Sequence, residues 1–234
     1  MPADRSKHFG PALAIATLLA ALGAIALSLA FADRPIATFM FQTMHESRGP
    51  FAASGHIVDA LEYAAALVLV WSLWMVARGR RFGPRGGIVL RTALALFVAI
   101  GVKELLKLAF GRTWPETWTG GNPSFIRDGA FGFSPFHGGA GWASFPSGHE
   151  TLTCAVAACL WILAPRLRPL YVLVVLIVAI GLLVADYHWL SDIFAGGLIG
   201  ALIGVFFARL ELPPVREKLN AASGVGAENP PITN

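Results

Sequence analysis

Polar and ionisable residues that could take part in catalysis occur in three short clusters, each next to a long apolar segment. Residues of these types are costly at membrane depth, so each cluster is a candidate functional site. The clusters contain Lys103, Glu104, Lys107 and Arg112, then Ser147, Gly148, His149 and Glu150, then His188, Ser191 and Asp192. Together they supply cations, a potential nucleophile and a potential acid, which is the set that phosphoryl transfer needs.

The second cluster has two interpretations. Ser147 precedes an apolar segment and Glu150 follows three residues later, which is the pattern of a helix capping box. The same geometry points backbone N–H groups and the positive end of a helix at an anion, which suits a phosphate. Capping alone does not require His149, so Ser147 and Gly148 can serve both purposes.

The third cluster pairs a histidine with a carboxylate. His188 and Asp192 are four residues apart, so they lie on one face if the helix has begun by His188. The carboxylate can then hold one imidazole nitrogen and leave the other for attack or proton transfer. The alternative is an interfacial histidine followed by helix-capping residues, because Ser191 and Asp192 are both good caps.

Metal binding is a competing use of histidine and carboxylate. The nearby lysines and arginine would repel a cation, and neither a His-x-x-x-His pair nor a carboxylate cluster occurs. We therefore predict no metal site and no cofactor. The only cysteines, Cys154 and Cys159, fall in an apolar segment and are interpreted as packing residues.

The composition is that of a membrane protein. The chain has 234 residues, of which 56% are hydrophobic and 14% charged, and its mean hydropathy is +0.63. This balance excludes an ordinary soluble domain. The net charge of +4 does not indicate nucleic-acid binding, because the basic residues form short groups between apolar segments.

A membrane-spanning helix needs about 20 mostly apolar residues. We predict an all-α polytopic bundle of six such helices within a single domain, residues 1–211. The spans are expected at about 11–32, 56–77, 87–110, 147–163, 170–185 and 193–208. Residues 212–234, rich in Pro, Ala, Gly and Asn, are predicted to form a disordered cytoplasmic tail.

Lysine and arginine collect at alternate connections, which predicts that both termini are cytoplasmic. The loops 33–55, 112–146 and 186–191 then share the opposite face, where all three polar clusters also lie. In an alternative interpretation, Arg5 and Lys7 with the following apolar segment form a cleavable secretory signal. Cleavage would leave five spans and the same outer loops.

These residues resemble the type 2 phosphatidic acid phosphatase family, which is part of the vanadium haloperoxidase-like superfamily. Residues 146–149 match the family's Pro-Ser-Gly-His segment, and His188 with Asp192 matches its His-x-x-x-Asp segment. The resemblance covers roughly residues 103–197 and implies a six-helix membrane bundle with metal-free catalysis.

The resemblance also implies a role for each matching residue. His188 would attack phosphorus to form a phosphohistidine, Asp192 would orient it, and His149 would protonate the leaving group. The phosphoryl oxygens would be held by Lys107, Arg112, Ser147 and Gly148.

Two positions depart from the family pattern. The family places arginine seven residues after its lysine and directly before proline, where this chain has Trp114. Arg112 instead matches an earlier arginine that many members carry. A second family arginine, six residues before the histidine, is replaced by Leu182. Arg127 is either a substitute for it or an ordinary loop arginine.

The aromatic loop between Trp114 and Trp142 has several interpretations. One interpretation is that its aromatic side chains anchor the loop at the membrane interface, and the others are that they bind a lipid or form a lid.

The expected function is a membrane lipid phosphatase that hydrolyses a lipid phosphate or pyrophosphate at the non-cytoplasmic face. Its partners are then the bilayer and the lipid substrate, with no nucleic acid and no obligatory protein partner. A bacterial inner membrane with the site facing the periplasm or exterior is the expected location. The alternatives are a lipid phosphotransferase and a non-catalytic protein that binds anionic lipids through a degenerate site.

Overall fold

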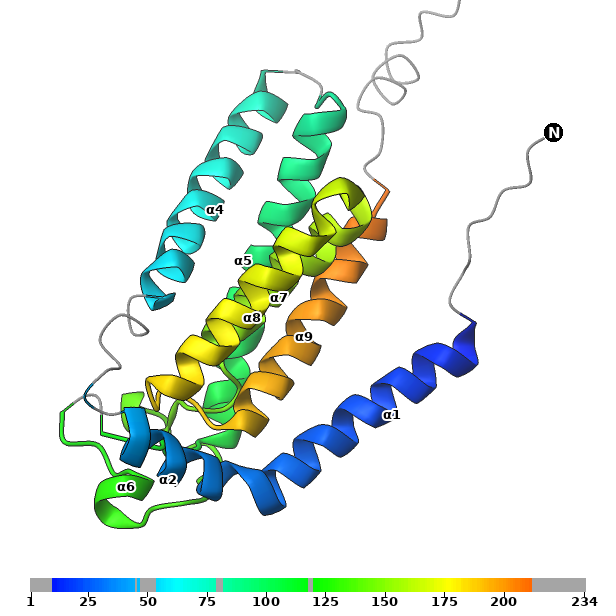
Figure 1. Ribbon diagram of the computed structural model, residues 1–234. Helices are drawn as coiled ribbons and strands as arrows, with labels where there is room; N and C mark the ends of the chain where they lie inside the picture. Colours follow the sequence, from blue (N-terminus) through cyan, green and yellow to red (C-terminus); the bar gives the residue numbers. More distant parts are fainter. Residues whose placement is uncertain (1–9, 45, 47–53, 79–81, 118–119, 212–234) are drawn as a thin grey trace, which may run out of the picture.

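The structure is a computed structural model that describes residues 10–44, 46, 54–78, 82–117 and 120–211 (Figure 1). These residues are mostly helical and contain no β-strand, only isolated bridges such as the one between Arg112 and Phe133. The prediction of an all-α fold is therefore confirmed for the described part of the chain. The predicted tail, residues 212–234, and the basic residues Arg5 and Lys7 lie outside it.

Five long helices form the bundle, and the N-terminal helix leaves it at an angle (Figure 1). The bundle helices are α4 (Ser54–Ala77), α5 (Pro84–Phe110), α7 (Gly148–Leu163), α8 (Arg168–Val184) and α9 (Leu190–Arg209). The remaining elements are α1 (Pro11–Leu27), η1 (Ser28–Ala32), α2 (Asp33–Met44), α6 (Phe125–Asp128), η3 (Ala140–Trp142) and η4 (Pro165–Leu167). Each of the six predicted apolar segments coincides with a helix to within a few residues.

Three helical segments of the described chain are long and apolar enough to cross a membrane: Pro11–Met44, Pro165–Val184 and Leu190–Arg209. The apolar helices Tyr63–Ala77 and Gly148–Leu163 are shorter. Helix α5 has 27 residues, but it carries several charged residues that lower its hydropathy. Six crossings, and cytoplasmic placement of both termini, remain predictions.

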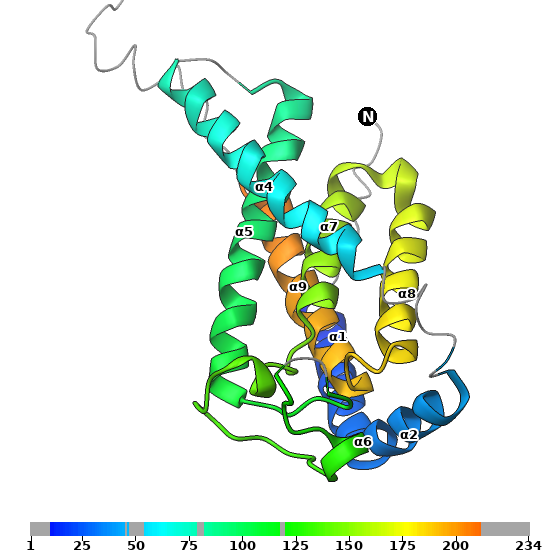
Figure 2. The ribbon, with the colours of Figure 1, turned by 90° about the vertical axis from the view of Figure 1, so that its left-hand side faces the viewer.

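The predicted loop 33–55 is wrong for residues 33–44, which are helical. A π-helical segment, η1, follows α1 and leads directly into α2, so the chain stays helical from Pro11 to Met44. Pro35 has no N–H and its ring crowds the preceding turn, which explains why the regular α-helical pattern is interrupted there. The chain bends at this point, and α2 lies across the end of the bundle (Figure 2).

Helices α7 and α9 pack closely because α9 presents a glycine stripe to α7. A Cβ atom at Gly196 would lie 2.5 Å from the Ser147 carbonyl oxygen, and one at Gly200 would lie 2.2 Å from the Thr151 carbonyl oxygen. Gly204 continues the stripe at the same four-residue spacing. Small residues at this spacing allow helix backbones to approach each other in membranes. The starts of α7 and α9, which carry the candidate site, are thereby held together.

Helix α5 ends at Gly111, a position that only glycine can occupy without a steric clash. Gly111 is left-handed, with φ of 57°, and its N–H donates to the Lys107 carbonyl oxygen. A Cβ there would lie 1.9 Å from the Ser134 carbonyl oxygen. The helix thus ends where the predicted apolar segment 87–110 ends, and left-handed glycine is a common helix-ending residue. The turn leads directly into Arg112, whose side chain is buried, and the chain then enters the loop that contains α6 (Figure 2).

Candidate active site

The first part of the site is the start of helix α7. The Ser147 hydroxyl caps the helix by accepting from the Glu150 N–H at 3.4 Å, as the capping interpretation predicts. The Ser147 N–H donates to the Asp192 carbonyl oxygen at 3.0 Å, which joins α7 to the first turn of α9. Because this end of α7 is its positive end, it is suited to bind an anion.

The second part is the pair of His188 and Asp192. Helix α9 begins at Leu190, so His188 lies in the turn before the helix and not within it. Its Nδ1 nevertheless lies 3.4 Å from Asp192 Oδ2. The same Asp192 oxygen accepts from the Ser144 hydroxyl at 2.6 Å and from the Trp189 N–H at 3.2 Å. Asp192 therefore combines helix capping with holding one nitrogen of the imidazole.

The two predicted catalytic histidines face the same space. The ring of His149, in the first turn of α7, has its centroid 6.4 Å from that of His188. His188 is 4% exposed, whereas His149 is partly exposed. A phosphoryl group held between the rings can reach a nucleophile on one side and a proton donor on the other.

Burial lowers the pKa of His188 from its ordinary value. The hydrogen bond and the charge of Asp192 oppose this effect, and the charge of Lys107 adds to it. A histidine with a lowered pKa is neutral at pH 7, and only the neutral ring has a nitrogen lone pair for attack.

Two lysines of α5 approach the start of α7. A Cβ at Gly148 would lie 3.5 Å from Lys107 Nζ and 3.6 Å from Lys103 Nζ. Both lysine side chains are mostly buried, at 18% and 13% exposure, while their shared neighbour Glu104 is 59% exposed. Lys103 was not among the expected phosphate-binding residues, although its position one helical turn before Lys107 is visible in the sequence.

Arg112, one of the expected phosphate-binding residues, is paired with carboxylates of the protein itself. Its side chain is buried, with NH1 bonded to Asp192 Oδ1 and to the Ser191 hydroxyl, and NH2 bonded to Asp33 Oδ2 at 2.7 Å. Both terminal nitrogens thus donate to carboxylates. This geometry favours a role in orienting Asp192 over direct contact with a phosphate.

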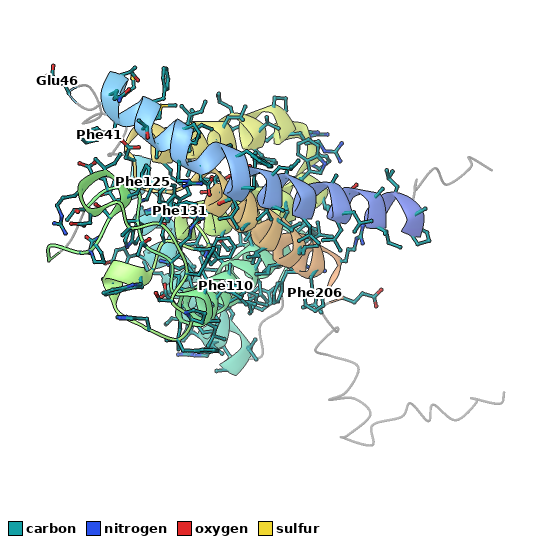
Figure 3. All side chains as sticks on the ribbon, turned by 90° about the horizontal axis from the view of Figure 1, so that it is seen from below. Phe41, Glu46, Phe110, Phe125, Phe131 and Phe206 are labelled. Carbon is teal, nitrogen blue, oxygen red and sulfur yellow. The ribbon has the colours of Figure 1, made fainter. Side chains whose placement is uncertain are left out.

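Aromatic rings enclose the Arg112 guanidinium. The rings of Phe131, Phe133 and Trp189 have centroids 5.4, 5.0 and 5.1 Å from its central carbon. Phe131 and Phe125 lie beside α2 when the molecule is seen from below (Figure 3). These aromatic residues shield the ion pairs from water, a role that the sequence interpretations did not include.

The positions that depart from the family pattern have distinct environments. The Trp114 ring lies 5.1 Å from the His188 ring, and its Nε1 donates to the Ala140 carbonyl oxygen at 2.7 Å. Leu182 is buried in an apolar cluster with Val178 and Ile193. Trp114 therefore borders the site, whereas Leu182 belongs to the bundle core.

Arg127 lies in α6, the one-turn helix within the loop between α5 and α7. It contacts Asp128 and the carbonyl oxygens of Gly121 and Asn122, and its side chain is 48% exposed. These contacts favour the interpretation of Arg127 as a structural arginine within the loop over that of a substitute phosphate ligand.

Comparison with known proteins gives a consistent result. The model of the PAP2 superfamily matches residues 88–213. A lipid A 1-phosphatase of Rhizobium johnstonii is 29% identical over 218 residues, which cover 84% of this chain and 82% of that protein. A lipid A 1-phosphatase of Rhizobium etli is also 29% identical, over 84% of this chain and 86% of its own length.

A solved structure shares the fold. It is that of a transmembrane PAP2 type phosphatidylglycerolphosphate phosphatase from Bacillus subtilis, with a TM-score of 0.51 and 16% sequence identity. The similarity covers 86% of this chain and 94% of that one. The helical arrangement therefore matches that of a PAP2-type membrane protein.

We predict that Arg112→Met strongly destabilises the protein. The change leaves Asp33 and Asp192 buried without their counter-charge, which typically costs about 3–5 kcal/mol. Thermal unfolding in detergent micelles measures the effect. Arg127→Met, which removes an exposed arginine from the loop, is the matched control and should change the melting temperature far less. Equal effects of the two changes would contradict the structural role of Arg112.

Proposed function

Because the chain belongs to the PAP2 superfamily, we propose that it is a membrane lipid phosphatase acting through a phosphohistidine. The observation that carries this proposal is the convergence of His188, His149 and two lysines at the start of α7. The arrangement provides a nucleophile, an acid and positive charge around one space, as a phosphoryl-transfer site requires.

In the first step, His188 is the nucleophile. Asp192 holds its Nδ1, so Nε2 attacks phosphorus and a P–N bond forms. The bond from phosphorus to the lipid oxygen breaks, and His149 gives a proton to that oxygen. Dephosphorylated lipid leaves, and His149 is left as the neutral base.

In the second step, a water molecule replaces the lipid. His149 takes a proton from the water, whose oxygen attacks phosphorus while the P–N bond breaks. Inorganic phosphate leaves and His188 returns to its neutral form. Throughout both steps the Lys107 and Lys103 ammonium groups, the Ser147 hydroxyl and the Gly148 amide stabilise the phosphoryl oxygens.

The substrate is proposed to be a lipid phosphate. The two Rhizobium relatives are named lipid A 1-phosphatases, so the 1-phosphate of lipid A is the first substrate to test. Phosphatidylglycerol phosphate, phosphatidate and a polyprenyl pyrophosphate complete the panel, because each presents a phosphate at the membrane surface.

Neither of the two proposed reaction steps requires a metal.

We predict that the purified protein releases phosphate from at least one lipid of this panel and that His188→Ala abolishes the release. Vanadate, which adopts the pentacoordinate geometry of the transition state, should inhibit. Free phosphate is measured, with lipid products separated by chromatography.

Absence of phosphate release above the His188→Ala control on every lipid would overturn the phosphatase proposal. Transfer of phosphate to a second lipid with little free phosphate would instead indicate a phosphotransferase. Binding of anionic lipid without either reaction would favour the non-catalytic alternative.

We predict that Lys103→Met lowers kcat/KM by about 10- to 100-fold, because it removes a cation from the phosphoryl oxygens. Vanadate inhibition should weaken in parallel. Arg85→Met is the matched control, since Arg85 is an exposed cation near the opposite end of α5. Unchanged kcat/KM in folded Lys103→Met would remove Lys103 from the site.

We propose that the site faces the non-cytoplasmic side, as the distribution of basic residues predicts. In a background with both native cysteines changed to alanine, Phe136→Cys should react with an impermeant thiol reagent in intact cells. Phe136 is 75% exposed in the loop at the site's end of the bundle. Arg85→Cys should react only after lysis, and the reverse pattern would overturn this orientation.

A further inference from the structure

Asp33 is a buried carboxylate that none of the expected roles includes. It lies at the junction of η1 and α2, is 1% exposed, and its N–H donates to the Ser28 carbonyl oxygen. Its carboxylate accepts from the Ser191 N–H at 2.9 Å and from the Ser191 hydroxyl at 2.5 Å. A carboxylate is buried at this cost only where hydrogen bonds and a counter-charge compensate.

The counter-charge is Arg112, which Asp33 shares with Asp192. The Arg112 guanidinium bonds Asp33 through NH2 and Asp192 through NH1. Asp192 and Arg112 alone would form a neutral pair. With Asp33 included, two carboxylates face one guanidinium, so the three ionised groups carry one net negative charge.

The net negative charge affects the charged form of His188, because Asp192 contacts that ring. Attack on phosphorus places positive charge on the imidazole ring. A neighbouring group with net negative charge stabilises such a ring more than a neutral pair does. The Asp192 carboxylate can therefore support His188 while it also binds Arg112.

We propose that Asp33 is a positioning residue of the phosphoryl-transfer site, which fixes Arg112 together with Ser191 and keeps the Asp192 carboxylate effective toward His188. The catalytic relevance of this inference rests on the function proposed above. The charge coupling itself is a property of the folded protein.

The local backbone supports this role. Segment η1 widens the helix just before Asp33, and π-helical turns of this kind occur frequently at functional sites. Both η1 and α2 contact α9, whose first turn carries Ser191 and Asp192. Through Asp33, the helical segment Pro11–Met44 therefore contacts the first turn of α9 directly.

The test is the titration of His188 in Asp33→Asn, followed by NMR of labelled histidine in detergent micelles. The charged and titratable groups around His188 are Asp192 on α9, Lys107 on α5, His149 on α7 and, through Asp192, Arg112. All of these remain in the variant.

The asparagine can still accept from Ser191 but carries no charge, so the remaining groups favour the imidazolium less. The pKa of His188 should therefore fall by about half a unit or more. On the preferred lipid, kcat should fall roughly tenfold while KM changes little.

Asp33→Glu restores the charge, so the titration of His188 should return toward that of the unchanged protein. Asp128→Asn removes an exposed carboxylate from the loop and should leave the titration unchanged. An unchanged His188 titration in folded Asp33→Asn would overturn the proposal. It would also be overturned if neither Asp33 variant folded, since Asp33 would then serve folding alone.

The NMR readout needs no substrate, which separates the two proposals. A shifted titration without phosphate release on any lipid would reject the phosphatase proposal and keep the charge coupling. Phosphate release with an unshifted His188 titration would reject the charge coupling and keep the phosphatase proposal.

Discussion

The buried Arg112 guanidinium, held between the carboxylates of Asp33 and Asp192, is the interaction on which the geometry of the site depends. It joins three segments that are distant in the sequence: the bend between η1 and α2, the turn after α5, and the first turn of α9. Removal of Arg112 leaves two carboxylates uncompensated in an environment from which aromatic rings exclude water, and removal of either aspartate takes a hydrogen-bonded anion from the guanidinium. The ion pairs of Arg112 therefore hold the three segments in fixed relative positions.

Close packing of α7 and α9 provides the second constraint. The stripe of Gly196, Gly200 and Gly204 lets the two backbones approach, so both helices bring their positive ends to the same place. His149 projects from the start of α7, and His188 is held by Asp192 from the start of α9. The bundle helices therefore supply the rigid frame, and the turns before α7 and α9 supply the reactive groups.

The helical segments and the histidine motifs could be predicted from the sequence, because hydropathy and residue spacing are local properties. Six apolar segments coincide with helices, and the cap at Ser147 and the helix end at Gly111 match their local signals. The number of membrane crossings and the roles of the site residues remain predictions. They depend on a bilayer and a substrate.

The contacts of Asp33 and Arg112 could not be predicted, because they depend on long-range packing. Asp33 follows an apolar segment and was expected to begin a loop, and no local pattern pairs it with Ser191, 158 residues later. Arg112 was placed by analogy on the phosphate, yet its nearest anions are the carboxylates of its own fold. The glycine stripe and the pair of Lys103 and Lys107, in contrast, can be recognised in the sequence, because residues four apart lie on one face of a helix.

The proposed mechanism requires His188 to carry the phosphoryl group between the two steps. The most direct test is to quench the protein rapidly during turnover of a radiolabelled lipid phosphate and to map the label by mass spectrometry. We expect a phosphate that is stable to base, labile to acid and attached to His188. A label on another residue, or no protein-bound phosphate during active turnover, would contradict it.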